Sequence, residues 1–138
     1  MDVKLQAFSE ALESLAYLVK VDLAALSVTL DPRLIDGIRN GQAQKFEYTI
    51  ELCWKAIKEY LKQHEGIDEA SPKKVVKAFY LSGCLAEDDY LALTQAIDDR
   101  NKLSHVYEQR EFDLIVNRLP QYADLMQRLL ETLSHTPR

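Results

Sequence analysis

The fold of this chain is set by residues 46–61, FEYTIELCWKAIKEYL, where apolar residues recur at helical spacing. Seven side chains of this stretch share one face of a helix: Phe46, Ile50, Cys53, Trp54, Ile57, Tyr60 and Leu61. Glu51 lies four residues before Lys55 on the outer side, where the two can form an ion pair. The stretch therefore predicts an amphipathic helix with its apolar face in a core.

The segment before this helix predicts a second one. Apolar residues advance there in steps of three and four at Leu5, Phe8, Leu12, Leu15 and Val19. We expect a helix from about Val3 to about Val28, stopped by Asp31-Pro32. Gly37 and Gly41 are expected in the connection to the next helix.

Glycine and proline mark the boundaries after the central helix. Gly66 is expected to close it. Ser71 and Pro72 resemble an N-cap followed by proline at the first helical position, and Gly83 supplies a stop, which predicts a short helix. A further helix should begin at the acids 87–89, which favour the positive end of the helix dipole.

The last segment predicts a long helix with a continuous apolar face. Its apolar residues recur at intervals of seven in two interleaved sets: Phe112, Leu119, Met126 and Leu133, with Ile115, Tyr122 and Leu129. Pro120 should kink this helix without ending it. Because no segment alternates with period two, we predict an all-α fold: an antiparallel up-and-down four-helix bundle with an additional short helix, in a single domain over residues 1–138.

Composition fits a soluble domain of ordinary kind. The 138 residues are 47% hydrophobic and 28% charged, and no apolar run approaches the roughly 18 residues of a membrane-spanning helix. The first residues lack the basic and apolar segments of a secretory signal, and Cys53 and Cys84 lack the spacing of a metal site. We expect a cytoplasmic protein with no cofactor, no metal and no membrane association.

The net charge of −5 argues against an extended nucleic-acid surface and leaves room only for a local site. The densest basic run is Lys73, Lys74 and Lys77, which is either a solvated helix face or, at Lys73 and Lys74, a nucleotide contact. Tyr48 lies off the apolar stripe and is a second candidate nucleotide contact, because aromatic faces stack on bases. The aromatic residues on the stripe are expected to pack in the core.

Residues 100–107, RNKLSHVY, carry the candidate chemistry. Arg100 offers a permanent planar fork of donors for phosphate, and His105 can exchange a proton near neutral pH. Together they suffice, without a metal, for attack of an RNA 2′-hydroxyl on its neighbouring phosphate. Tyr107 adds a hydroxyl that can bind a phosphate or accept a transferred group.

The geometry of a straight helix does not bring these three side chains together. At about 100° per residue, Arg100 and Tyr107 point almost the same way, but His105 lies about 140° away. Convergence requires the helix to end or distort near Ser104-His105, or a second subunit to supply the missing group. The structural alternative is that Arg100 pairs with a nearby acid such as Asp98 or Asp99, the histidine caps a helix and the tyrosine packs.

Residues 100–107 match the R-x4-H-x-Y form of the Arg-to-His motif of HEPN proteins (higher eukaryote and prokaryote nucleotide-binding). Together with QKFEYTIELCWKAIKEYLKQHEGI (44–67), SPKKVVKAFYLSGCL (71–85) and AIDDRNKLSHVY (96–107), the chain resembles the nucleotidyltransferase substrate-binding protein family within that group. The resemblance extends from about Leu5 to Tyr107.

The resemblance implies a helical bundle that forms a homodimer and pairs with a separate small MNT-type nucleotidyltransferase encoded nearby. In related toxin–antitoxin pairs the HEPN protein is a metal-independent RNase, and its partner silences it by adding adenylyl groups to the motif tyrosine. Arg100 and His105 would then be catalytic, Tyr107 the modification acceptor, and Asn101 and Ser104 auxiliary polar groups. The two motifs of such a dimer face one cleft.

The chain does not look like a nucleotidyltransferase itself. That class of enzyme has a Gly-Ser turn followed by paired aspartates that hold magnesium, and no Gly-Ser dipeptide occurs here. The adjacent acids Asp88-Asp89 and Asp98-Asp99 diverge by about 100° on a helix, so we expect them to be solvated or to lie at a helix N-terminus. Three hypotheses therefore stand: a nucleotidyltransferase-docking module with RNA or a nucleotide as a further ligand, a metal-independent RNase, and a helical dimerisation protein without chemistry.

Overall fold

The computed structural model describes residues 2–105 and 108–135, which form six helices and no strand. In chain order the helices are α1 (Val3–Val19), α2 (Leu23–Leu26), α3 (Pro32–His64), α4 (Pro72–Leu81), α5 (Glu87–Leu103) and α6 (Gln109–Ser134). The predicted all-α class is confirmed.

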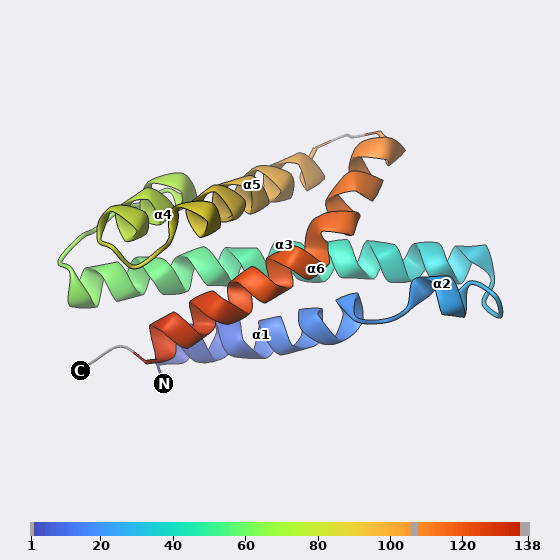
Figure 1. Ribbon diagram of the computed structural model, residues 1–138, viewed down its shortest axis with the longest axis horizontal. Coiled ribbons are helices and arrows are strands. Elements are labelled where there is room, and N and C mark those ends of the chain that lie inside the picture. The colour runs from blue at the N-terminus through green and yellow to red at the C-terminus, as the bar shows by residue number, and fades with distance from the viewer. Residues whose placement is uncertain (1, 106–107, 136–138) are drawn as a thin grey trace.

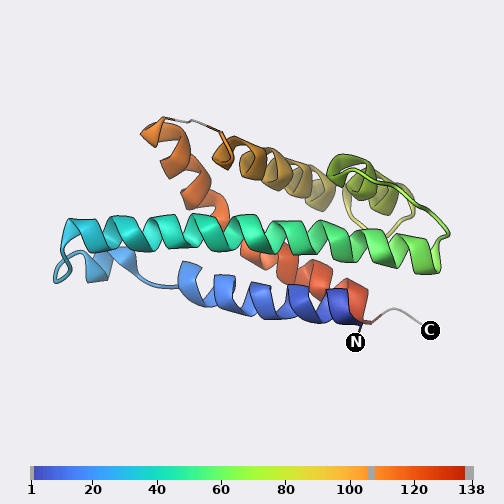
Figure 2. The same ribbon diagram turned by 180° about the vertical axis from the view of Figure 1, so that it is seen from behind.

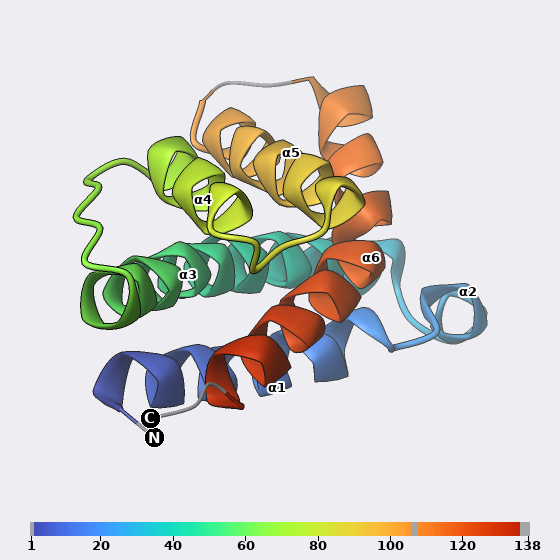
Figure 3. The same cartoon turned by 60° about the vertical axis from the view of Figure 1, so that its left-hand side comes forward.

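Helix α3 is the axis of the molecule and contacts α1, α4, α5 and α6. Successive long helices α1, α3, α5 and α6 run in alternating directions (Figure 1), and the view from behind shows the same antiparallel pairing of α1 with α3 (Figure 2). The short helix α4 and α5 lie on the side of α3 away from α1 (Figure 3). The bundle is therefore the antiparallel arrangement that the sequence predicts.

The predicted apolar stripes form one core. On α3, Phe46 and Ile57 are fully buried and Trp54 is nearly so. The stripes of α1 and α6 pack against them with the side chains Phe8, Leu12, Leu15, Ile115, Leu119, Tyr122 and Met126. Tyr60, expected in the core, packs at its edge and is only half-buried.

The single helix predicted over about Val3–Val28 is wrong, because the chain breaks between α1 and α2. Asp22 starts α2 by accepting a hydrogen bond from the Ala25 N–H at 3.0 Å, so its carboxylate acts as an N-cap. At the end of α1 the Leu18 carbonyl accepts a hydrogen bond from Gln42 Nε2 of α3 at 3.1 Å. A local cap and a contact from a distant residue thus replace the continuous helix.

The connection predicted around Gly37 and Gly41 is also wrong, since both glycines lie inside α3. Asp31-Pro32 begins this helix: the Asp31 carboxylate accepts a hydrogen bond from the Arg33 N–H at 2.8 Å, and proline occupies the first turn. A proline preceded by an N-cap residue is a start signal as much as a stop signal. The start signal outweighs the cost of two helical glycines, about 1 kcal/mol each.

The later boundaries agree with the sequence. Helix α3 ends just before Gly66, which has φ of +66°, and α4 begins at Pro72 after the N-cap Ser71. Gly83, with φ of +82°, follows α4, and α5 starts with the predicted acids 87–89. The glycine stops and the acidic first turn are therefore confirmed.

Substitution by alanine should have opposite effects at Gly66, which has a positive φ, and at Gly37, which is helical. Gly66→Ala should lower the free energy of unfolding by about 1 kcal/mol, because its positive φ is unfavourable for any residue with a Cβ. Gly37→Ala should raise it by about 0.5–1 kcal/mol, since a Cβ there meets nothing within 4 Å and the position is helical. Urea unfolding of both variants measures the difference. Equal changes in the free energy of unfolding would contradict the positive φ of Gly66 and hence the observed end of α3.

Helix α6 changes direction near its middle, where Pro120 lies inside the helix (Figure 1). Proline has no N–H to donate and its ring crowds the preceding turn, so a kink without termination is expected. The bend carries α6 from α5 towards α1. None of the described helices is both long and apolar enough to span a bilayer.

Candidate functional site

Arg100 reaches from α5 towards α3, where its guanidinium lies beside a carboxylate. The Arg100 Nη2 atom is 3.6 Å from Glu51 Oε2, a distance that makes an ion pair without a hydrogen bond. About one third of the Arg100 side chain is exposed (34%). Its Nε atom, however, is buried and has no hydrogen-bond partner among the described residues. One donor of the guanidinium is thus unsatisfied.

Glu51 is shared by three side chains. Trp54 Nε1 donates a hydrogen bond of 3.1 Å to Oε2, the oxygen that faces Arg100. Lys55 Nζ lies 3.5 Å from Oε1, which confirms the ion pair predicted four residues apart on α3. The carboxylate is therefore held on its own helix whether or not the arginine is beside it.

Arg100 and Asn101 line one small pocket of about 30 Å³ between α3, α4 and α5. Its walls include Trp54 and Pro72, the first residue of α4. A space of this size holds one or two water molecules and no larger group unless a side chain moves. The structure thus brings Arg100 together with one of its predicted auxiliary residues.

Helix α5 ends within the R-x4-H-x-Y motif, between Arg100 and His105. Leu103 is its last residue, Ser104 is the C-cap, and the Ser104 hydroxyl donates to the Arg100 carbonyl at 3.3 Å. His105 follows outside the helix, and its N–H donates to the Lys102 carbonyl at 3.1 Å. Helix α5 thus ends next to Ser104 and His105, which meets one of the two conditions under which the three side chains could converge.

The imidazole is not placed in the Arg100 pocket. His105 is exposed, and no hydrogen bond or ion pair within the described part of the chain joins it to Arg100. Tyr107, the predicted modification acceptor, lies outside the described residues. Within one chain, the described geometry thus groups Arg100 with Asn101 and leaves His105 at the helix end.

The acids next to Arg100 do not behave as expected. Arg100 pairs with Glu51 of α3 and not with its neighbours, because Asp98 pairs with Lys73 of α4. Asp99, expected to be solvated, is only 1% exposed. The structural alternative is thus right that Arg100 pairs with an acid, and wrong about which acid.

Asp99 instead lies at the centre of a buried contact between α5 and α6. It accepts hydrogen bonds from Arg118 Nε and Nη2, both at 2.8 Å, and from the Tyr122 hydroxyl. Burial and the hydrogen bond to Asp99 raise the pKa of Tyr122, and the same carboxylate raises the pKa of Arg118. Tyr122 also stacks on Phe46 with ring centroids 5.4 Å apart, so the contact is continuous with the core.

Sequence reasoning missed this cluster, although one signal was present. Asp99 lies three residues after Ala96 and four before Leu103, which places it on the buried stripe of α5. Arg118 and Tyr122 are four residues apart on one face of α6. A charged residue on an apolar stripe signals a buried partner, since lone buried charges are strongly unfavourable.

A second carboxylate lies near Arg100. Partial burial raises the pKa of Glu47, which lies one helical turn before Glu51, and the charge of Arg100 opposes that rise. Glu47 also borders a groove of about 400 Å³ together with Asn40, Gln44 and Phe112. Arg100 therefore lies within reach of two acids on α3, which makes its surroundings less favourable for an added anion.

The predicted nucleotide contacts lie on α3 and α4, and none of them lines the Arg100 pocket. Tyr48 is 63% exposed, as expected for a residue off the stripe. Lys73 is engaged by Asp98, and Lys74 is exposed. The part of the chain that the structure describes contains no group of three or more His, Cys, Asp or Glu side chains able to hold a metal ion.

The chain is similar to a described protein family and to a solved structure. The model of a family described as "Nucleotidyltransferase substrate binding protein like" matches residues 3–135. A crystal structure of a protein from Thermus thermophilus is similar over 91% of this chain and 98% of its own, with 32% identity and a TM-score of 0.79. No curated protein matches the chain.

Proposed function

Because the chain belongs to the nucleotidyltransferase substrate binding protein like family, we propose that it docks a separate small nucleotidyltransferase of the MNT type. The family match over residues 3–135 carries this proposal, since it spans both the bundle and the Arg100 site. The chain lacks the Gly-Ser turn of a nucleotidyltransferase, so the transfer chemistry belongs to the partner. The protein acts as a cytoplasmic homodimer of one domain over residues 1–138, in a toxin–antitoxin type module.

Docking is tested by co-expression with the nucleotidyltransferase encoded next to this chain. Size-exclusion chromatography with light scattering should give a stable complex that contains two copies of this chain. The protein alone should elute as a dimer. Separate elution of both proteins at micromolar concentration would reject the partnership.

Tyr107 should gain AMP when the protein is incubated with that partner, ATP and magnesium. Peptide mass spectrometry should find the added mass on the peptide that contains Tyr107, because a phenol can accept a transferred adenylyl group. Tyr17 and Tyr48, which are 75% and 63% exposed, are internal controls for exposure alone. Modification of these two tyrosines to the same extent, or of Tyr107→Phe protein, would contradict a specific acceptor.

A second candidate function is metal-independent cleavage of RNA by the R-x4-H-x-Y motif, silenced by modification of Tyr107. It is supported by the buried Nε of Arg100, which has no partner in the part of the chain that the structure describes, and by His105 just after the same helix. A phosphate would supply the acceptor that this Nε lacks. The second subunit of the dimer would bring an imidazole to the cleft from the other side.

A further inference from the structure

The ion pair between Arg100 and Glu51 is weak. The two groups are 3.6 Å apart without a hydrogen bond, and the Arg100 Nε has no hydrogen-bond partner within residues 2–105 and 108–135. Both side chains are about one third exposed, so solvent screens their attraction. A ligand that offers several acceptor oxygens would form better hydrogen bonds with this guanidinium than Glu51 does.

The Glu51 carboxylate keeps two of its three contacts if the Arg100 guanidinium moves away. These are the hydrogen bond from Trp54 Nε1 at 3.1 Å and the ion pair with Lys55 at 3.5 Å. Neither contact comes from α5. The carboxylate can therefore release the arginine without becoming an unpaired charge.

The charges around the pocket make this release necessary for an anion. Helix α3 contributes Glu47, Glu51 and Lys55, while Lys73, in the first turn of α4, is paired with Asp98. A phosphate that approached Arg100 with Glu51 in place would meet like charge at close range. The pocket of about 30 Å³ is also too small for a phosphate in the observed state.

We propose that Glu51 competes with phosphate-bearing ligands for the guanidinium of Arg100 and thereby sets how readily this site takes RNA or a nucleotide. The inference rests on the proposed function, because it concerns Arg100, the residue that would bind the phosphate in the proposed cleavage of RNA. It adds a residue outside the R-x4-H-x-Y motif and a mechanism: the ligand must separate Arg100 from a carboxylate that stays bound to Trp54 and Lys55.

The chain carries its own reporter of this displacement. Trp54 is the single tryptophan, and its Nε1 donates to the Glu51 oxygen that faces Arg100. Its fluorescence should therefore change when a ligand separates Glu51 from Arg100. The signal needs neither catalysis nor the partner protein.

The test titrates full-length protein with AMP and with a short oligouridylate, in EDTA, by Trp54 fluorescence and calorimetry. Glu51→Gln should bind about two- to fivefold more tightly than wild type, the factor expected from removing one partly exposed ion pair. The amide oxygen of the substituted side chain can still accept the Trp54 hydrogen bond. Tightening with either probe supports the competition, and the probe that tightens identifies free nucleotide or RNA as the source of the phosphate.

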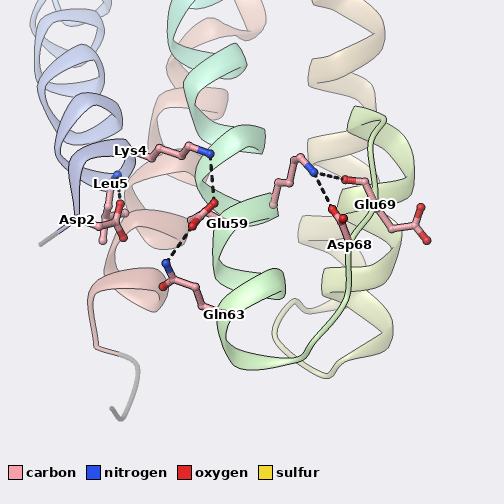
Figure 4. A network of polar contacts seen from close by, with 8 residues as sticks. Asp2, Lys4, Leu5, Glu59, Gln63, Asp68 and Glu69 are labelled. Carbon is pink, nitrogen blue, oxygen red and sulfur yellow. Dashed lines mark hydrogen bonds and ion pairs between the residues drawn. The ribbon is translucent and has the colours of Figure 1, made fainter.

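Glu59→Gln is the matched control for net charge. Glu59 lies eight residues further along α3 with a similar exposure, 27% against 31% for Glu51. Figure 4 shows its carboxylate between Lys4, at 3.2 Å, and Gln63, at 2.9 Å. Its removal should leave both affinities unchanged. Equal tightening in the two variants would mean a general charge effect and overturn the proposal.

Arg100→Gln completes the cycle. If the two residues compete as proposed, Glu51→Gln should have no effect on affinity in the Arg100→Gln background. Tightening that persists there, or failure of Glu51→Gln protein to bind either probe, would overturn the proposal. Failure of docking to the nucleotidyltransferase appears in a separate experiment, so the two results are distinguishable.

Discussion

Asp99→Ala should lower the free energy of unfolding by about 3–5 kcal/mol, the largest effect on stability that we expect among the charged residues. The substitution removes a carboxylate that is 1% exposed and accepts hydrogen bonds from Arg118 and Tyr122. It leaves the guanidinium without its counter-ion and the phenol without its acceptor in a buried contact. Urea unfolding followed by circular dichroism measures the change.

The chain offers a matched control for this ion pair. Arg118 and Arg128 both extend from α6 to an aspartate of α5, to Asp99 at 2.8 Å and to Asp89 at 2.9 Å. Asp89 is 28% exposed, so Arg128→Ala should cost less than about 1 kcal/mol. Arg118→Ala should cost several times more, because it leaves Asp99 charged and buried. Similar losses of unfolding free energy in Arg118→Ala and Arg128→Ala would show that the burial of Asp99 does not strengthen its ion pair.

If the RNase function is right, Arg100→Ala and His105→Ala should each reduce cleavage of single-stranded RNA in EDTA by about 100-fold or more. Loss of the arginine removes the group that stabilises charge on the phosphate, and loss of the histidine removes the proton shuttle. Gel analysis of a labelled oligonucleotide measures the rate. Retention of the wild-type rate in either variant would remove that residue from the mechanism.

Controls separate chemistry from folding in this experiment. His135 is exposed just after the last residue of α6, as His105 is exposed after the end of α5, so His135→Ala should retain full cleavage. The thermal midpoint of all three variants should stay near that of wild type. A mixture of Arg100→Ala and His105→Ala protein should recover part of the cleavage if each site takes its arginine and histidine from different subunits. No recovery would place both groups in one subunit.

Local patterns in the sequence determined most of the helices. The apolar stripe of residues 46–61 places Phe46 and Ile57 in the core, and Gly66 ends α3 as expected. These features depend on residues within one or two turns of each other, so their physics can be read from neighbours in the chain.

Two boundaries were wrong, the first because local signals conflict and the second because a distant residue takes part. Asp31-Pro32 can end one helix or begin another, and the Asp31 cap on Arg33 decides for the second. The break after α1 is stabilised partly by Gln42, which is 24 residues from the Leu18 carbonyl that it contacts. Spacing along one helix cannot reveal a partner on another.

The sequence by itself determined most of the helical residues, the apolar faces of α1, α3 and α6, and which side chains form the R-x4-H-x-Y motif. Only the tertiary structure decided the partners of Arg100 and Asp99: Glu51 for Arg100, 49 residues earlier, and Arg118 for Asp99, 19 residues later. The reason is physical. Helical periodicity acts between residues three or four apart, whereas a charge beside the core takes whichever opposite charge the packing of other helices brings within reach.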